Sequence, residues 1–268
     1  MLQEALDFET ESEELLMLLE SFSRQDWQRQ TQFKHWTAND VIAHLHFFNY
    51  AADLALSNSD ALARLMSELN AATKQGVPHL VFTRAKLGGL KDRELLKQWR
   101  DFYREMAQRF LVADPKKRVP WAGPSMSVRS SITARLMETW AHGQALYDLM
   151  GETRRENDRI RSIVVLGINT FAWTFANRQL PVPTSVPYVR LVAPSGAIWQ
   201  WGNRDPTNCV EGTAVDFCRV VTQVRNVSDT GLKVVGATAT AWMAIAQCFA
   251  GPPQDPPLPG TRFTQHRR

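Results

Sequence analysis

Cysteine is scarce in this chain. Only three occur among 268 residues, Cys209, Cys218 and Cys248, and no pair has Cys-x-x-Cys spacing. An odd count without that spacing argues against a disulfide framework and against a zinc site made of thiolates. We therefore expect three buried thiols that behave as small apolar side chains in a reducing cytosol.

Long hydrophobic runs are also missing. The longest uncharged apolar-rich run, Ser162–Asn177, contains the polar residues Asn169 and Thr170 and is shorter than the roughly 20 residues that a membrane-spanning helix needs. The acidic amino terminus lacks the basic start, apolar block and small-residue cleavage site of a secretory signal. We expect a cytoplasmic location and no membrane partner.

A broad surplus of basic charge is absent as well. The formal net charge is +4, but Arg262, Arg267 and Arg268 lie in the last eight positions, which contain no acid. Without these three arginines the charge is +1, so the sequence provides no extended basic surface. A nucleic-acid partner is therefore not expected, and the sequence does not indicate an oligomeric state.

The sequence does contain enough apolar material for a substantial core. Hydrophobic residues make up 44% of the chain and charged residues 22%, which is typical of globular proteins, and the length favours two domains. Apolar residues at helical spacing, separated by polar or glycine-containing breaks, predict helices over residues 2–22, 38–56, 60–74, 92–111, a segment that ends at Gly151, and 156–177. Thr37 or Asn39 can cap the second helix.

The composition changes after these helices. Pro181, Pro183 and Pro187 keep the chain extended and mark a domain boundary, and the following residues alternate short strands with two helices. We therefore predict an α+β protein with a four-helix-type bundle over residues 1–178 and a small α+β domain over 186–251. Residues 252–268 are rich in proline and basic at their end, and we expect an extended or disordered tail.

One polar pair stands out within the helix that ends at Gly151. Glu138 and His142 are four positions apart, so they point together, and they lie in a stripe of alanine and leucine that we expect to face the bundle interior. On the helix over residues 38–56, His44 falls in the apolar stripe, whereas His46 projects away from it. A second imidazole is thus predicted to point inward.

Two imidazoles and a carboxylate on facing helices form a three-ligand set that leaves a fourth metal position open, and zinc fits it best. Neutral histidines and one carboxylate would leave a divalent ion at net +1, suited to bind hydroxide or thiolate as a nucleophile. Because Glu-x-x-x-His spacing is common, the spacing alone leaves another interpretation open. Glu138 could instead pair with Arg135 or accept a hydrogen bond from an imidazole.

Three segments in order give the chain a family resemblance. Residues 36–45 (WTANDVIAHL), 119–127 (VPWAGPSMS) and 138–148 (ETWAHGQALYD) are similar to the DinB-like metal-binding superfamily, and within it to the mycothiol-dependent maleylpyruvate isomerase N-terminal domain. The resemblance covers about residues 1–175 and implies a zinc site made of His44, Glu138 and His142. The second half resembles the sterol-carrier-like domain of such isomerases more loosely. It is closer to an uncharacterised two-domain group whose second domain ends in AWxxIAQCFAGPP, here residues 241–253.

The resemblance implies that the metal activates a low-molecular-weight thiol, mycothiol or a similar compound, for isomerase or thiol-transfer chemistry on a small-molecule substrate. Two alternatives stay open, a metal-hydroxide hydrolase and a metal- or ligand-binding protein without turnover. Substrate identity and the metal used in the cell are not indicated.

Several other residues are candidates for weaker roles. Trp121 could line the metal pocket, and Arg219 and Arg225 could bind an anionic thiol cofactor or a substrate carboxylate, although solvated arginines are the simpler interpretation. Four further residues are not expected to bind the metal. These are His35 on the surface, His79 without a partner at metal spacing, Asp148 solvated near a helix end, and His266 in the tail.

Overall fold

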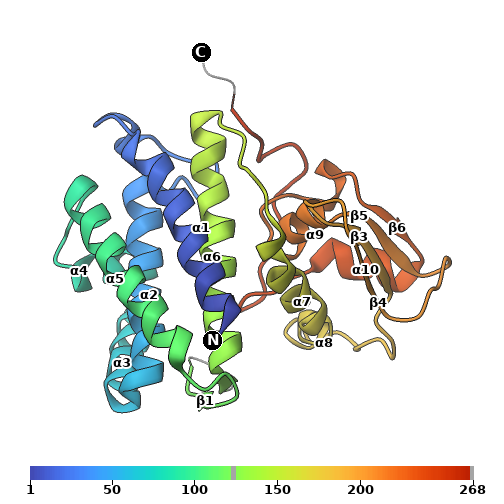
Figure 1. The fold of residues 1–268 in the computed structure, drawn as a ribbon, viewed down its shortest axis with the longest axis horizontal. Helices are drawn as coiled ribbons and strands as arrows, with labels where there is room; N and C mark the ends of the chain where they lie inside the picture. Colours follow the sequence, from blue (N-terminus) through green and yellow to red (C-terminus); the bar gives the residue numbers. More distant parts are fainter. Residues whose placement is uncertain (122–124, 266–268) are drawn as a thin grey trace. The chain divides into compact units, whose positions relative to one another are not determined.

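The computed structural model describes residues 1–121 and 125–265 and divides into two compact units, Met1–Leu149 and Met150–Arg268. The first unit is helical (Figure 1). Its elements are α1 (Gln3–Glu20), α2 (Ala38–Ser57), α3 (Ser59–Lys74), α4 (His79–Lys86), α5 (Asp92–Val112), the short strands β1 (Arg118–Val119) and β2 (Met126–Ser127), and α6 (Val128–Met150).

The core of the first unit forms around α5. Helices α1 and α2 both pack against α5, whose Trp99, Tyr103 and Phe110 are fully buried. Phe8 of α1 meets the edge of the Tyr103 ring at 6.4 Å between centroids. Helix α6 joins α1 through Tyr147, whose hydroxyl donates a hydrogen bond of 3.3 Å to the Glu14 carbonyl. The interior positions of these helices are therefore the apolar ones that the helical spacing indicates.

The helices predicted over residues 2–22, 38–56, 60–74 and 92–111 are confirmed to within two residues at each end. Helix α4 was not predicted. It follows the turn at Gly76, begins directly after Pro78, and buries only Thr83. A single helix of eight residues with one buried side chain has too weak a periodicity to be recognised from sequence.

The second unit is a small mixed sheet with helices. Its elements are α7 (Arg161–Asn169), α8 (Phe171–Ala176), β3 (Tyr188–Val192), β4 (Ile198–Trp201), β5 (Cys209–Thr213), α9 (Ala214–Val221), β6 (Lys233–Val235) and α10 (Ala237–Ile245). The strand order is β4-β3-β5-β6, in which β3 and β5 are parallel and both outer pairs are antiparallel. Trp242 of α10 contacts Phe171 of α8 and Phe217 of α9, so its ring connects the three helices. The predicted α+β class is thus confirmed at this coarse level.

The division between the units falls earlier in the chain than the boundary predicted at residue 178. Helix α7 packs against α9 within the second unit, and a Cβ on Gly167 would lie 2.9 Å from a Val221 methyl group. The helix predicted over residues 156–177 is also interrupted. The break lies at Thr170, whose hydroxyl donates to the carbonyls of Leu166 and Gly167, and α8 begins at the next residue.

The carboxy-terminal segment, expected to be extended or disordered, is extended as far as residue 265. It is also hydrogen-bonded to the rest of its unit. Gln223 donates to the Gln254 carbonyl at 2.7 Å, Asn226 donates to the Pro257 carbonyl at 2.8 Å, and Arg262 donates to the Gln223 carbonyl at 2.7 Å. Prolines prevent strand pairing, but amide side chains of the unit donate to carbonyls of the segment, and Arg262 of the segment donates to a carbonyl of the unit.

Two predictions about absences can be compared with the structure. The three cysteines are buried and form no disulfide, as expected. Within residues 1–121 and 125–265, no helix is long and apolar enough to cross a membrane.

Candidate metal centre

The position of His44 is set by the start of α2. Thr37 caps this helix in a capping box. Its hydroxyl accepts from the Asp40 backbone at 3.3 Å, and the Asp40 carboxylate accepts from the Thr37 backbone at 2.9 Å. Asn39, the alternative cap, instead forms paired hydrogen bonds with Asp92 at the start of α5. These contacts fix where α2 begins and hold its first turn against the start of α5, and α2 in turn carries His44.

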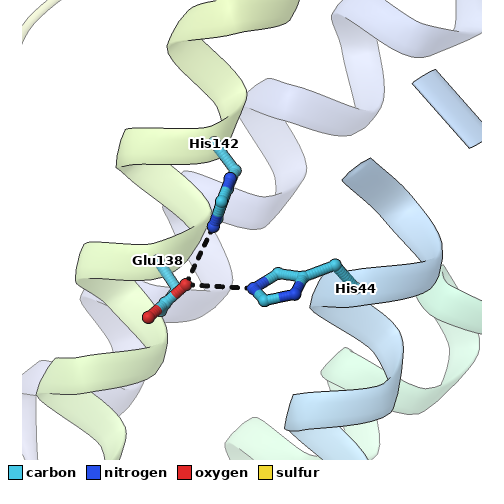
Figure 2. A group of neighbouring side chains, drawn as sticks. All are labelled: His44, Glu138 and His142. Carbon is cyan, nitrogen blue, oxygen red and sulfur yellow. Dashed lines mark hydrogen bonds and ion pairs between the residues drawn. The ribbon is translucent and has the colours of Figure 1, made fainter. Parts of the chain in front are cut away.

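Glu138 and His142 project from α6 toward His44 (Figure 2). One carboxylate oxygen, Oε2 of Glu138, lies 3.0 Å from His142 Nε2 and 3.2 Å from His44 Nε2. One ligand atom from each residue falls within 4.8 Å of the others. In a tetrahedral zinc site with bonds of about 2.0–2.1 Å, ligand atoms lie roughly 3.3 Å apart. The three side chains are therefore already close to the separation that such an ion requires.

Aromatic rings enclose both imidazoles. Trp36 stacks on His142 with 5.7 Å between centroids and an interplanar angle of 11°, and Phe33 meets the same imidazole edge-on at 5.0 Å. Phe48 lies 4.8 Å from the His44 ring. Between 13 and 19% of each of the three ligand side chains remains exposed, so the apolar enclosure is incomplete.

The protonation states suit a cation. Burial, aided by the neighbouring His142, lowers the pKa of His44 to about 4, which leaves its imidazole neutral at pH 7. Burial alone would raise the pKa of Glu138, but hydrogen bonds from His142 and His44 and the charge of Arg135 hold it well below its usual value. A neutral imidazole and an ionised carboxylate are the forms that bind a metal.

Arg135 lies one turn before Glu138 on α6. Its side chain is only 5% exposed, and its Nη2 lies 3.9 Å from Glu138 Oε1. The guanidinium carbon sits over two aromatic rings, 5.8 Å from Phe48 and 5.6 Å from Trp121. Trp121 is thus placed against a side chain next to the cluster, and its role in binding a cofactor stays a prediction.

Two buried residues differ from what was predicted. Asp148 is not solvated: it is 4% exposed and accepts a hydrogen bond of 3.0 Å from Gln144 within α6. His46 lies outside the cluster, as its projection indicated, yet it is buried against Phe102 of α5 at 5.4 Å. Asp148 and His46 are both buried because other parts of the protein cover α2 and α6 on more than one face. A single apolar stripe in the sequence does not reveal this.

The remaining candidates lie elsewhere. His35 is exposed, as expected, His79 is exposed as well, and His266 is outside the described residues. Arg219 pairs with Asp216 at 3.3 Å, and Arg225 is buried and donates to the Val224 carbonyl at 3.2 Å. Both arginines belong to the second unit, where their predicted role as anion contacts stays a prediction. The aromatic enclosure by Phe33 and Trp36 was not predicted; the only sequence signal was their position just before the Thr37 cap.

The fold and the cluster define a class of protein in which a helical unit with a candidate metal site precedes a small mixed sheet. The chain belongs to the mycothiol maleylpyruvate isomerase N-terminal domain family, whose profile matches residues 8–147. The family resemblance seen in the sequence is therefore confirmed.

Two curated relatives extend the match beyond that domain. They are uncharacterized proteins of Mycobacterium tuberculosis, from strains H37Rv and CDC 1551, each 36% identical over 247 residues that cover 92% of this chain and 95% of the relative.

Two solved structures share the fold. The crystal structure of the mycothiol-dependent maleylpyruvate isomerase has a TM-score of 0.55 and 14% identity and covers 86% of this chain and 91% of that one. A histidine-to-alanine mutant of that isomerase has a TM-score of 0.52 and 13% identity, with coverages of 81% and 87%.

Proposed function

We propose that His44, Glu138 and His142 hold a divalent metal, zinc for preference, and that the chain uses it to activate a low-molecular-weight thiol such as mycothiol for isomerase or thiol-transfer chemistry. The observation that carries the proposal is the convergence of both Nε2 atoms on one oxygen of Glu138, at 3.0 and 3.2 Å. The family to which the chain belongs supports the choice of thiol.

The donor set fits an ion that also binds an exogenous ligand. Among the described residues, no other histidine, cysteine, aspartate or glutamate joins the group. Three protein ligands with a free fourth position are typical of catalytic rather than structural zinc. When bound, such a metal would lower the pKa of a thiol or a water in that position toward neutrality.

The chain's own residues contribute charge and exclude water. Glu138 supplies a single negative charge between two imidazoles, of which His44 is neutral at pH 7. The rings of Phe33, Trp36 and Phe48 surround the imidazoles and lower the local dielectric, which strengthens electrostatic interactions with an anionic ligand. Without an ion these residues favour a cation, and with a divalent ion bound the site would favour an anion next to it.

Metal analysis of the purified full chain tests the ligand assignment. We expect stoichiometric zinc in the wild type and in His79→Ala, an exposed histidine in the same unit, and loss of zinc in His44→Ala, Glu138→Gln and His142→Ala. The loss of affinity should exceed the roughly 10–100-fold that removal of an outer-shell partner costs. Full metal content in the three ligand variants would show that the site is assigned wrongly.

Cobalt substitution separates the proposed chemistry from its alternatives. A low-molecular-weight thiol should shift the visible spectrum of the cobalt protein and add a thiolate charge-transfer band. A spectrum that does not change at millimolar thiol would contradict thiol activation and favour a hydrolase or a binding protein without turnover.

A further inference from the structure

Arg135 has hydrogen-bonding capacity that residues 1–121 and 125–265 do not use. Its guanidinium is buried, yet Nε and Nη1 have no hydrogen-bond partner among these described residues, and the 3.9 Å separation of Nη2 from Glu138 is too long for a hydrogen bond. A guanidinium carries five N–H donors and stays charged at neutral pH. Burial of such a group without partners costs free energy, so the unused donors need an explanation.

The nearby carboxylate of Glu138 balances the charge of Arg135, but it does not satisfy the hydrogen-bond donors of the guanidinium. Oε1 of Glu138 faces the guanidinium, while Oε2 faces the two imidazoles. A single carboxylate group therefore separates the arginine from the place where the three ligand atoms converge. A ligand that contacts both positions must therefore span this carboxylate group.

The charge balance favours an anion there. Imidazoles that bind a metal are neutral. The opposite charges of Glu138 and Arg135 cancel each other, so a divalent ion would leave the site at net +2. One anionic ligand atom on the metal reduces this to +1, and a second negative group on the same molecule would neutralise it. A carboxylate matches the planar donors of an arginine and forms the stronger class of charge-assisted hydrogen bonds.

We propose that Arg135 is a subsite for a carboxylate next to the metal-bound thiol, so that a short thiol that carries a carboxylate binds more tightly than its neutral analogue. Phe48 and Trp121, over which the guanidinium lies, form the apolar walls of this subsite. This inference rests on the proposed metal- and thiol-binding function.

The test compares two ligands that differ only in charge. The cobalt-loaded full chain is titrated at constant pH with 3-mercaptopropionate and with its neutral amide, 3-mercaptopropionamide, and each dissociation constant is read from the visible spectrum. We expect the wild type to bind the acid roughly 10- to 100-fold more tightly than the amide, as a hydrogen-bonded charge pair would give. Arg135→Gln should bind both about equally, because it loses the affinity for the acid alone.

Arg129→Gln is the matched control. Arg129 is an arginine of the same helix, 59% exposed, and 3.5 Å from Glu4, so its replacement should leave the preference for the acid unchanged. Arg135→Lys keeps the charge without the planar donors and should retain only part of the preference. If Arg135→Gln fails to fold or to bind cobalt, Arg135→Lys decides the question.

The outcomes distinguish this inference from the proposed function. A wild type that binds both thiols with equal affinity, or an Arg135 variant that keeps the full preference for the acid, overturns the carboxylate subsite and leaves thiol binding intact. Failure of both thiols to change the cobalt spectrum overturns the proposed function, and the subsite with it.

Discussion

At the scale of single residues, Trp36 contacts the proposed metal-binding histidines without binding the metal itself. Its ring is nearly parallel to the His142 imidazole, and it also contacts His44 at 5.4 Å, but it offers no metal-binding atom. Stacking of this kind restricts the rotation of the imidazole and thus reduces the entropy that the side chain loses on metal binding.

We therefore expect Trp36→Leu to lower the affinity for zinc by about 10-fold, at the lower end of what outer-shell partners contribute. Trp36→Phe should recover most of this loss because an aromatic ring remains. Competition with a chromophoric chelator measures the affinity, and Trp173→Leu, at a 38% exposed tryptophan of the second unit, is the control. An unchanged affinity in Trp36→Leu would mean that the stack does not orient His142.

The same scale shows what sequence can reveal about a site. Helical spacing alone predicted that Glu138 and His142 point together, and the apolar stripe around His44 predicted that this side chain points inward. The burial of Arg135 and the stacking of Trp36 depend on segments that lie far apart in the chain, and spacing within one helix cannot show such contacts. The misjudged burial of Asp148 has the same cause.

At the scale of secondary structure elements, Gly236 forms the connection between β6 and α10 and needs a backbone conformation that other residues rarely adopt. Its φ of +93° is disfavoured for other residues, and a Cβ would lie 2.4 Å from the Thr207 carbonyl oxygen and 2.9 Å from the Asn208 Cα. Both are backbone atoms, which cannot move aside as a flexible side chain does.

We predict that Gly236→Ala destabilises the second unit by about 1–3 kcal/mol more than Gly196→Ala does. Gly196 has a similar φ of +87°, but its Cβ position has no atom within 4 Å, so this control carries the backbone strain without the steric contact. Hydrogen exchange of the β5 and β6 amides measures the difference. Equal effects of the two substitutions would show that the backbone near Thr207 relaxes freely.

The predicted elements were most accurate where local signals were strong. The capping residue and the regular apolar spacing of α2 defined its limits closely, and the β-branched and aromatic runs defined β3 and β4. The prediction failed at α4 and at the break after α7. A short exposed helix has little periodicity, and the apolar residues on both sides of Thr170 continue the same helical spacing in the sequence. The boundary at residue 178 was set by prolines, which mark extended chain but do not show which unit a helix packs against.

At the scale of the whole molecule, the two units should respond differently to the metal. All three ligands lie in the first unit, so binding stabilises the folded state of that unit relative to its unfolded state. The sheet of the second unit contributes no ligand to the cluster.

We expect zinc at about 100 times its dissociation constant to stabilise the first unit by about 2.7 kcal/mol, which corresponds to roughly 100-fold slower exchange of its core amides. Chelation with EDTA should reverse this effect in α2 and α6 and leave the rates in β3 and β5 unchanged. Hydrogen exchange with mass spectrometry compares the two regions in one experiment. Zinc protection that persists in His142→Ala would contradict a metal site at this cluster.

The spacing of the ligands along the chain has a consequence for the order of folding. Glu138 and His142 are neighbours on one helix, whereas His44 is 94 residues away from Glu138. In a refolding chain the local pair can form as soon as α6 forms, but the third ligand arrives only when α2 docks and the intervening loop closes. High-affinity metal uptake should therefore be a late kinetic event, and its rate should report the assembly of the helices rather than the diffusion of the ion.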